Sequence, residues 1–196
     1  GIPAAVATWN AEDLEDALAA AETCGTIVRD AAERRRHPQG YLGVMGLSAG
    51  TAVVVSALEL LPNDVQVDYV VLFEPSISAT RNLAPAMRHV RGKLYATCSA
   101  NDGILGTLLA TADGGPLPPA GKIGFRVPLG LPAGQRPPYA RVVNLPWRSK
   151  YRRMGWNGGH VSSTTSKFVE LVIAPRMLQP LEIEAERHTA VAASVE

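Results

Sequence analysis

The sequence lacks several features that mark special classes of protein. It has only two cysteines in 196 residues, which excludes the disulfide framework of small secreted domains. Cys24 lies in a helical pattern and Cys98 in an apolar strand pattern, so we expect both thiols to act as small buried hydrophobic groups. No uninterrupted apolar run approaches the ~20 residues of a membrane-spanning helix. We therefore expect no membrane span.

Charge is close to balanced over the chain but unevenly distributed along it. The formal net charge is +1, which gives no reason to expect nucleic acid or a membrane surface as a partner. Residues 114–169 contain no Asp or Glu and nine Lys or Arg, whereas residues 11–30 contain six acids. The basic stretch predicts either a basic face or, more simply, a solvated Arg-rich loop.

Metal and nucleotide sites also lack their usual signatures. The four histidines are scattered, and no pair of His or Cys has the spacing of metal ligands. Residues 43–48 lack the Lys of a Walker loop and do not have the spacing G-x-G-x-x-G. We expect neither a cofactor nor a metal ion.

The composition is that of one folded domain, with 46% apolar and 19% charged residues. Strand-like and helix-like segments alternate along the chain, which predicts an α/β fold with a mostly parallel, doubly wound sheet. We expect this domain to cover residues 1–174 and to be followed by a C-terminal tail at residues 175–196.

Apolar runs and helical periodicity locate the individual elements. Strands are predicted at about residues 4–8, 41–45, 67–73, 93–99 and 139–145. Helices are predicted at about residues 10–36, 49–61, 82–90, 104–112 and 162–173, with Ser162 or Ser163 as the cap of the last one. Residues 113–138 contain seven prolines and are long for a connection, so we expect a loop that covers part of the domain.

One pentapeptide, Gly46-Leu47-Ser48-Ala49-Gly50, points to specific chemistry. It joins a predicted strand to a predicted helix, which is the context of a nucleophile elbow. The turn strains the backbone of Ser48, and we expect side chains in place of Gly46 or Gly50 to collide with the strand or helix. The helix N-terminus, through the amide of Ala49, is expected to bind a developing oxyanion. The ordinary alternative is a glycine-rich turn of any α/β protein.

A serine nucleophile needs a base within hydrogen-bond reach. His160 follows Gly158-Gly159 and precedes the last predicted helix, which places it at the carboxyl edge of the sheet together with Ser48. His37 and His89 are expected at other places in the fold, and His188 lies in the polar tail. We therefore predict His160 as the base.

The base needs an acid that fixes its tautomer. Asp102 follows the strand at residues 93–99 directly and is the predicted acid. Glu74, which follows the strand at residues 67–73, is the alternative acid, and Asp113 is a weaker one. The order Ser48, Asp102, His160 is the chain order of α/β-hydrolases.

The elbow at residues 46–50, the Asn101-Asp102-Gly103 turn and Gly158-Gly159-His160 together resemble the α/β-hydrolase superfamily of lipase- and esterase-like enzymes. The similarity covers most of residues 1–174 and says little about substrate. It implies a serine hydrolase that cleaves an ester or other acyl bond of a small substrate through an acyl-enzyme on Ser48. Apolar residues of the loop at 113–138 are expected either to wall the acyl pocket or to pack on the core: Leu117, Ile123, Phe125, Val127, Leu129 and Leu131.

The chain departs from the superfamily before the elbow. Family members have several strands there, and a loop after the third supplies a second oxyanion donor. Only the strand at residues 4–8 is predicted ahead of the elbow strand, so we expect a fold without the N-terminal strands. A missing donor typically lowers the rate by about 100- to 1,000-fold. The alternative function is a weak or inactive hydrolase-like subunit that pairs with another chain at the edge near residues 4–8.

Overall fold

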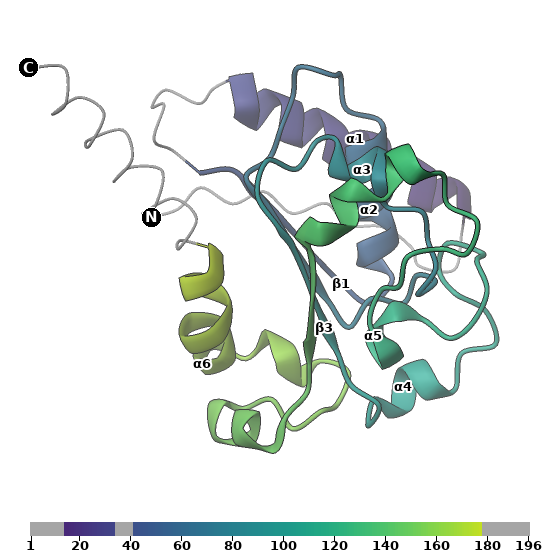
Figure 1. Cartoon of the computed structure of the whole chain (residues 1–196). Helices are drawn as coiled ribbons and strands as arrows, with labels where there is room; N and C mark the ends of the chain where they lie inside the picture. Colours follow the sequence, from purple (N-terminus) through teal and green to yellow (C-terminus); the bar gives the residue numbers. More distant parts are fainter. Residues whose placement is uncertain (1–13, 34–40, 178–196) are drawn as a thin grey trace, which may run out of the picture.

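The computed structural model describes residues 14–33 and 41–177 of the chain. In these residues a parallel sheet lies between two layers of helical segments (Figure 1). The predicted α/β class with a parallel sheet is therefore confirmed. Within the described ranges, no helix combines the length and the apolar character that crossing a bilayer requires.

The described sheet has four strands in the order β1-β2-β3-β4, and every neighbouring pair is parallel. The strands are β1 (Gly43–Leu47), β2 (Tyr69–Phe73), β3 (Leu94–Cys98) and β4 (Val142–Pro146). Leu47 is in register with Phe73, and Cys98 with Pro146, so the strands end at a common edge. The loops that follow all four strands therefore meet at that edge.

Alternate residues of β2 supply two separate cores, because successive side chains of a strand point to opposite faces. Val70 and Leu72 belong to the core on one face of the sheet, whereas Val71 and Phe73 belong to the core on the other face. All four side chains are buried. The first face is covered by α1 (Leu14–Glu33), α2 (Gly50–Glu59) and α3 (Ala84–Met87).

Helix α2 directly follows the predicted elbow and is buried on most of its surface. Val54, Val55 and Leu58 belong to the core on the sheet, while Val53 and Ala57 pack against α1. Burial of one Val or Leu side chain stabilises a fold by roughly 1.5–3 kcal/mol. The start of α2 is thus held by core packing on two sides.

On the opposite face, three aromatic rings pack together. Tyr151, Trp156 and Phe168 have ring centroids 4.7–5.4 Å apart. Tyr151 lies in the 3₁₀ segment η3 (Ser149–Met154), and Phe168 ends the short helix α6 (Ser166–Phe168). The chain between these two elements includes Trp156 and His160, so the aromatic cluster fixes the loop that carries His160.

Several predicted elements exist with other bounds. Strand β2 begins at Tyr69 instead of residue 67, and Val67 makes only an isolated bridge to Val90. Strand β4 begins at Val142 instead of residue 139, because consecutive prolines fix the backbone of the 3₁₀ segment η2 (Pro137–Arg141).

The predicted helix at residues 104–112 is wrong in most of its length. Only α4 (Gly103–Gly106) forms. Beyond it the chain turns back, and the amide of Ala112 donates to the carbonyl of Ser76. Asp113 then accepts a hydrogen bond from the amide of Ser78. These contacts with the segment after β2 replace helical hydrogen bonds.

Residues 113–138 contain two short helical segments, α5 (Ala120–Ile123) and η1 (Ala133–Gln135), and the first two residues of η2. Their apolar side chains divide into two groups. Phe125 and Leu131 are buried, as the packing alternative predicted. The other four are exposed: Leu117, Ile123, Val127 and Leu129.

The last helix does not begin at a serine cap. Ser162 lies in a 3₁₀ turn, and α6 begins at Ser166 without a side-chain cap. A single π-type stretch (Val169–Ile173) follows it. Here the predicted cap is wrong, because the Ser162 hydroxyl instead donates to the carbonyl of Gly159 and to Asn157.

Other predictions fall outside the described residues. They include the strand predicted at residues 4–8, and with it the expected lack of further N-terminal strands and the sheet edge expected to pair with another chain. Residues 178–196 of the predicted tail also lie outside the described residues. Within the described residues, both cysteines are free thiols, and Cys98 is buried while Cys24 is half-buried.

Candidate active site

Ser48 lies between β1 and α2 with φ of +52°, in the left-handed region that is unusual for a residue with a side chain. Such a conformation costs of order 1–3 kcal/mol and persists only where the surroundings impose it. The amide of Ser48 donates to the carbonyl of Phe73 over 2.9 Å, and its carbonyl accepts from the amide of Thr51 over 3.0 Å. The elbow is thus bonded to both β2 and α2.

The two glycines of the elbow have different roles. A Cβ atom at Gly46 would lie 2.8 Å from the carbonyl oxygen of Gly50 and 3.0 Å from Val54, so glycine is required there. A Cβ atom at Gly50 would meet no atom within 4 Å. The expected collision at Gly50 is therefore wrong.

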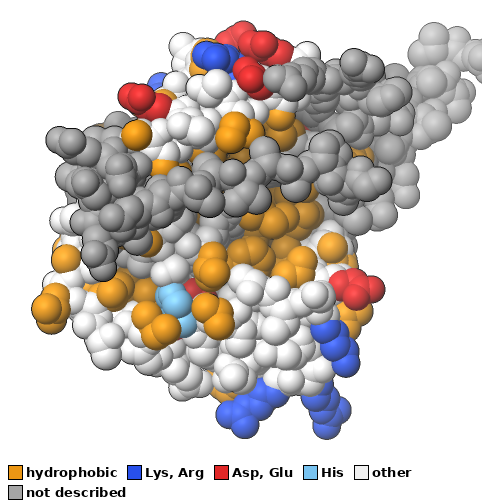
Figure 2. Space-filling model, turned by 180° about the vertical axis from the view of Figure 1, so that it is seen from behind, with side chains coloured by type: hydrophobic (Ala, Val, Ile, Leu, Met, Phe, Trp, Pro, Cys, Tyr) orange, Lys and Arg blue, Asp and Glu red, His pale blue; other side chains and the backbone are white. Residues whose placement is uncertain are grey.

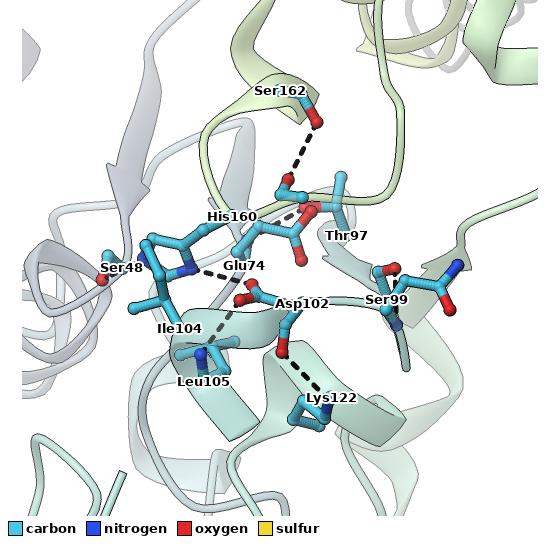
Figure 3. Close-up of polar contacts among 12 residues, drawn as sticks. Ser48, Glu74, Thr97, Ser99, Asp102, Ile104, Leu105, Lys122, His160 and Ser162 are labelled. Carbon is cyan, nitrogen blue, oxygen red and sulfur yellow. Dashed lines mark hydrogen bonds and ion pairs between the residues drawn. The ribbon is translucent and has the colours of Figure 1, made fainter. Parts of the chain in front are cut away.

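His160 joins the serine to an acid (Figure 3). Its Nε2 atom lies 2.7 Å from Ser48 Oγ, and its Nδ1 atom lies 2.7 Å from Asp102 Oδ2. The structure therefore brings together the three residues that the sequence singled out. Since a carboxylate only accepts hydrogen bonds, Nδ1 carries the hydrogen and Nε2 is free to accept one from the serine.

Asp102 comes from the turn after β3 and is fully buried. Its Oδ1 atom accepts from the amide of Leu105 over 2.9 Å, which caps α4 and leaves Oδ2 for His160. The side-chain nitrogen of Lys122 donates to the carbonyls of Ala100 and Asp102. Lys122 therefore ties α5, in the predicted cover loop, to the acid-bearing turn.

Neither alternative acid is bonded to the imidazole. Figure 3 shows the Glu74 side chain directed away from His160, toward Thr97. Burial, and secondly the charge of Asp102, raise the pKa of Glu74 from 4.5 to about 8. Asp113 lies elsewhere, where its carboxylate accepts from the amide of Ser78 and is 3.6 Å from Arg81.

The amide of Ala49 lies next to Ser48 at the start of α2. Among the described residues, no backbone carbonyl accepts a hydrogen bond from it. A free amide at a helix N-terminus is suited to bind negative charge. Ala49 is thus placed as the sequence predicted for an oxyanion donor.

Exposed apolar side chains lie close in sequence to two residues of the site, Asp102 and His160. Ile104 and Val161 are adjacent in sequence to Gly103 and His160, and their side chains are 55% and 61% exposed. On the face drawn in Figure 2, hydrophobic side chains gather around a histidine, and Figure 3 shows the Ile104 side chain next to His160. An apolar surround lowers the local dielectric constant and strengthens the hydrogen bonds within it.

The basic stretch is used partly for internal contacts. The guanidinium of Arg141 donates to main-chain carbonyls of Met87 and Arg91. Lys150 and Arg152 lie over the rings of Tyr151 and Trp147, each 5.5 Å from the ring centroid.

Two groups near the site were missed by sequence reasoning. Lys122 sits in a proline-rich stretch with no periodic pattern, and Ser163 was assigned to a helix cap. Lys122 bonds to the turn after β3, and Ser163 interacts with the side chain of Glu74 after β2. Both contacts join segments far apart in the chain, and no local pattern predicts them.

The described residues give no sign of a metal centre, since nowhere among them do three or more His, Cys, Asp or Glu side chains form a suitable group. Comparison with models of protein families, with curated proteins and with solved structures finds no match to this chain.

Proposed function

We propose that the protein is a serine hydrolase that cleaves an ester or another acyl bond through an acyl-enzyme on Ser48. The observation that carries the proposal is the hydrogen-bond chain from Ser48 through His160 to Asp102, with both distances at 2.7 Å. We also propose that the α/β domain is of the doubly wound α/β-hydrolase type. The order of elbow, acid and histidine after β1, β3 and β4 supports this assignment.

In the acylation step, His160 Nε2 takes the proton of Ser48 Oγ as the oxygen attacks the substrate carbonyl. The imidazolium that forms is stabilised by the Asp102 carboxylate at Nδ1. The same Nε2 proton then passes to the leaving alcohol or amine. In deacylation, water replaces the serine and His160 again acts as the base.

The amide of Ala49 stabilises the negative oxygen of each tetrahedral intermediate. It adjoins the nucleophile, and it has no backbone acceptor among the described residues. An oxyanion donor of this kind typically contributes about 100- to 1,000-fold to kcat.

The apolar surround of His160 favours a substrate with a small apolar acyl group. Ile104, two residues after Asp102, and Val161, which directly follows His160, offer exposed apolar surface. Apolar contact contributes roughly 25 cal/mol per Å² of surface removed from water. Esters of short fatty acids are therefore the first substrates to test.

Labelling with a fluorophosphonate probe tests the proposal directly. The wild-type protein should be labelled on Ser48, and labelling should be lost in Ser48→Ala. Ser149→Ala removes an exposed serine of η3 and is the matched control, which should be labelled normally. A folded wild-type protein without labelling or ester hydrolysis would reject the hydrolase and favour the inactive-subunit alternative.

A further inference from the structure

Glu74 is a buried carboxyl group that the proposed mechanism does not use. The residue is fully buried, and neither carboxyl oxygen has a partner at full hydrogen-bond geometry among the described residues. The same holds for two donors, Trp156 Nε1 and Ser163 Oγ, which are also fully buried. Such groups are costly to bury, so their presence in one place calls for a reason.

These groups interact with one another. Ser163, Thr97 and Trp156 act as hydrogen-bond donors toward the Glu74 carboxyl and lower its pKa, although burial outweighs them. None of these contacts reaches full hydrogen-bond geometry. Trp156 and Ser163 flank His160 in sequence, so the carboxyl faces the loop that carries the proposed base.

The backbone of Glu74 connects it to the elbow as well. Its φ is +42°, so it shares with Ser48 the strained left-handed conformation. Its amide donates to Thr97 Oγ1 over 2.9 Å. Its neighbour Phe73 accepts from the Ser48 amide, and Ser76 donates to the Ser48 carbonyl. Glu74 therefore lies where the segments bearing the nucleophile, the acid and the base meet.

The charge state of Glu74 follows from its neighbours. Burial is the main cause that opposes its ionisation, and the negative charge of Asp102 adds to it, whereas the nearby Cys98 has a pKa raised to about 11 and is an uncharged thiol at neutral pH. His160 is bonded to the carboxylate of Asp102, and Lys122 is bonded to the main-chain carbonyl of Asp102. With a pKa of about 8, Glu74 carries its proton at neutral pH and can both donate and accept hydrogen bonds.

We propose that Glu74 is a positioning residue, whose uncharged carboxyl joins the end of β2 to the loop at residues 156–163 and holds His160 between Ser48 and Asp102. This inference rests on the proposed function for its effect on turnover. An uncharged carboxyl bridges Ser163 and Trp156 without competing with Asp102 for the positive charge of His160. Ionisation would remove the carboxyl proton, which is the only hydrogen that the group can donate, and would add a second negative charge that interacts unfavourably with that of Asp102.

Three variants separate this role from ordinary packing. Glu74→Gln keeps one donor and one acceptor in the same shape, and kcat should fall by less than about fivefold at pH 7. Glu74→Ala removes both and should lower kcat by about 10- to 100-fold with little change in KM, because His160 loses its position. Asp113→Asn removes another buried carboxylate, outside the site, and should behave as wild type.

The pH profile gives a readout that packing alone would not move. The kcat of the wild type and of Asp113→Asn should decline as the pH rises through about 8, the pKa of Glu74. The same decline should be absent from Glu74→Gln. An identical decline in Glu74→Gln and wild type would overturn the proposal.

A measurement independent of turnover keeps the test separate from the proposed function. The Nδ1 proton of His160, which bonds to Asp102, should give a downfield proton NMR signal in the wild type, Glu74→Gln and Asp113→Asn. The signal should be broadened or lost in Glu74→Ala, or in Ser163→Ala if the former does not fold. An unchanged signal in these variants would reject the role of Glu74. A wild type that shows the signal but is neither labelled nor active would reject only the hydrolase.

Discussion

The side-chain nitrogen of Lys122 lies 3.0 Å from the main-chain carbonyl oxygen of Asp102, twenty residues earlier in the chain. The same nitrogen lies 2.7 Å from the carbonyl of Ala100. A positive charge thus holds the turn that presents the Asp102 carboxylate to His160. The proline-rich segment that contains α5 is therefore part of the support of the site.

Replacement of Lys122 by Met should loosen this turn. Met keeps the apolar length of the side chain and loses both hydrogen bonds, each of which contributes roughly 1 kcal/mol. We expect kcat to fall by about 3- to 30-fold, with KM less affected. Steady-state hydrolysis of a short-chain ester measures both constants. Lys167→Met, on the exposed side of α6, is the control, and equal kcat values for the two variants would contradict the assigned role.

Asp102→Asn should disable the base while the fold is retained. The amide cannot accept the Nδ1 hydrogen with a charged oxygen, and the histidine adopts the wrong tautomer for the serine. Triads in general lose about 10⁴-fold in kcat by this change. Asp113→Asn should retain activity, because Asp113 bonds to Ser78 and Arg81 instead. Retained activity in Asp102→Asn would indicate that another group orients His160.

The elbow glycines should respond in opposite ways to alanine. Gly46→Ala places a methyl group 2.8 Å from the Gly50 carbonyl and should destabilise the fold by roughly 1–3 kcal/mol. Gly50→Ala meets no atom within 4 Å and begins a helix, so its stability should equal or exceed that of the wild type. Urea unfolding of the two variants measures the difference, and similar losses in both would disprove the distinction.

Stability should depend on pH through Glu74. Burial raises its pKa in the folded state from 4.5 to about 8, so the folded protein binds one proton more than the unfolded chain between these values. The stability that this extra proton contributes is fully present below pH 4.5. It declines as the pH rises and is lost once Glu74 ionises in the folded protein near pH 8. The maximal slope for one proton is about 1.4 kcal/mol per pH unit.

Glu74→Gln should remove this dependence, because an amide does not titrate in this range. The free energy of unfolding of the wild type minus that of the variant should therefore fall between pH 5 and pH 8. Taking the difference cancels the titration of the other groups. A constant difference would show that Glu74 is ionised in the folded protein throughout this interval.

The local parts of the site could be predicted from sequence. The elbow is a pentapeptide, and α2 is apolar almost all round, so both its place and its burial follow from the residues themselves. Asp102 and His160 could be predicted because both follow strands of a parallel sheet, whose ends lie together. These predictions need only the identity of neighbouring elements.

The failed predictions involve contacts between distant segments. The helix expected at residues 104–112 has suitable residues, but Ala112 and Asp113 bond to the segment after β2. Ser162 and Ser163 have the composition of a helix cap, yet one bonds within its loop and the other faces Glu74. Which of these contacts forms depends on the assembled fold, so a short stretch of sequence does not predict it.

The aromatic cluster of Tyr151, Trp156 and Phe168 has a consequence for how activity is lost. The loop with His160 has little regular structure, and its position depends on the helical layer that packs on one face of the sheet. Partial unfolding of that layer would separate His160 from Ser48 while α1, α2 and the sheet remain folded. Inactivation in urea should then precede the loss of helical circular dichroism, so that activity serves as a probe of one subglobal unit.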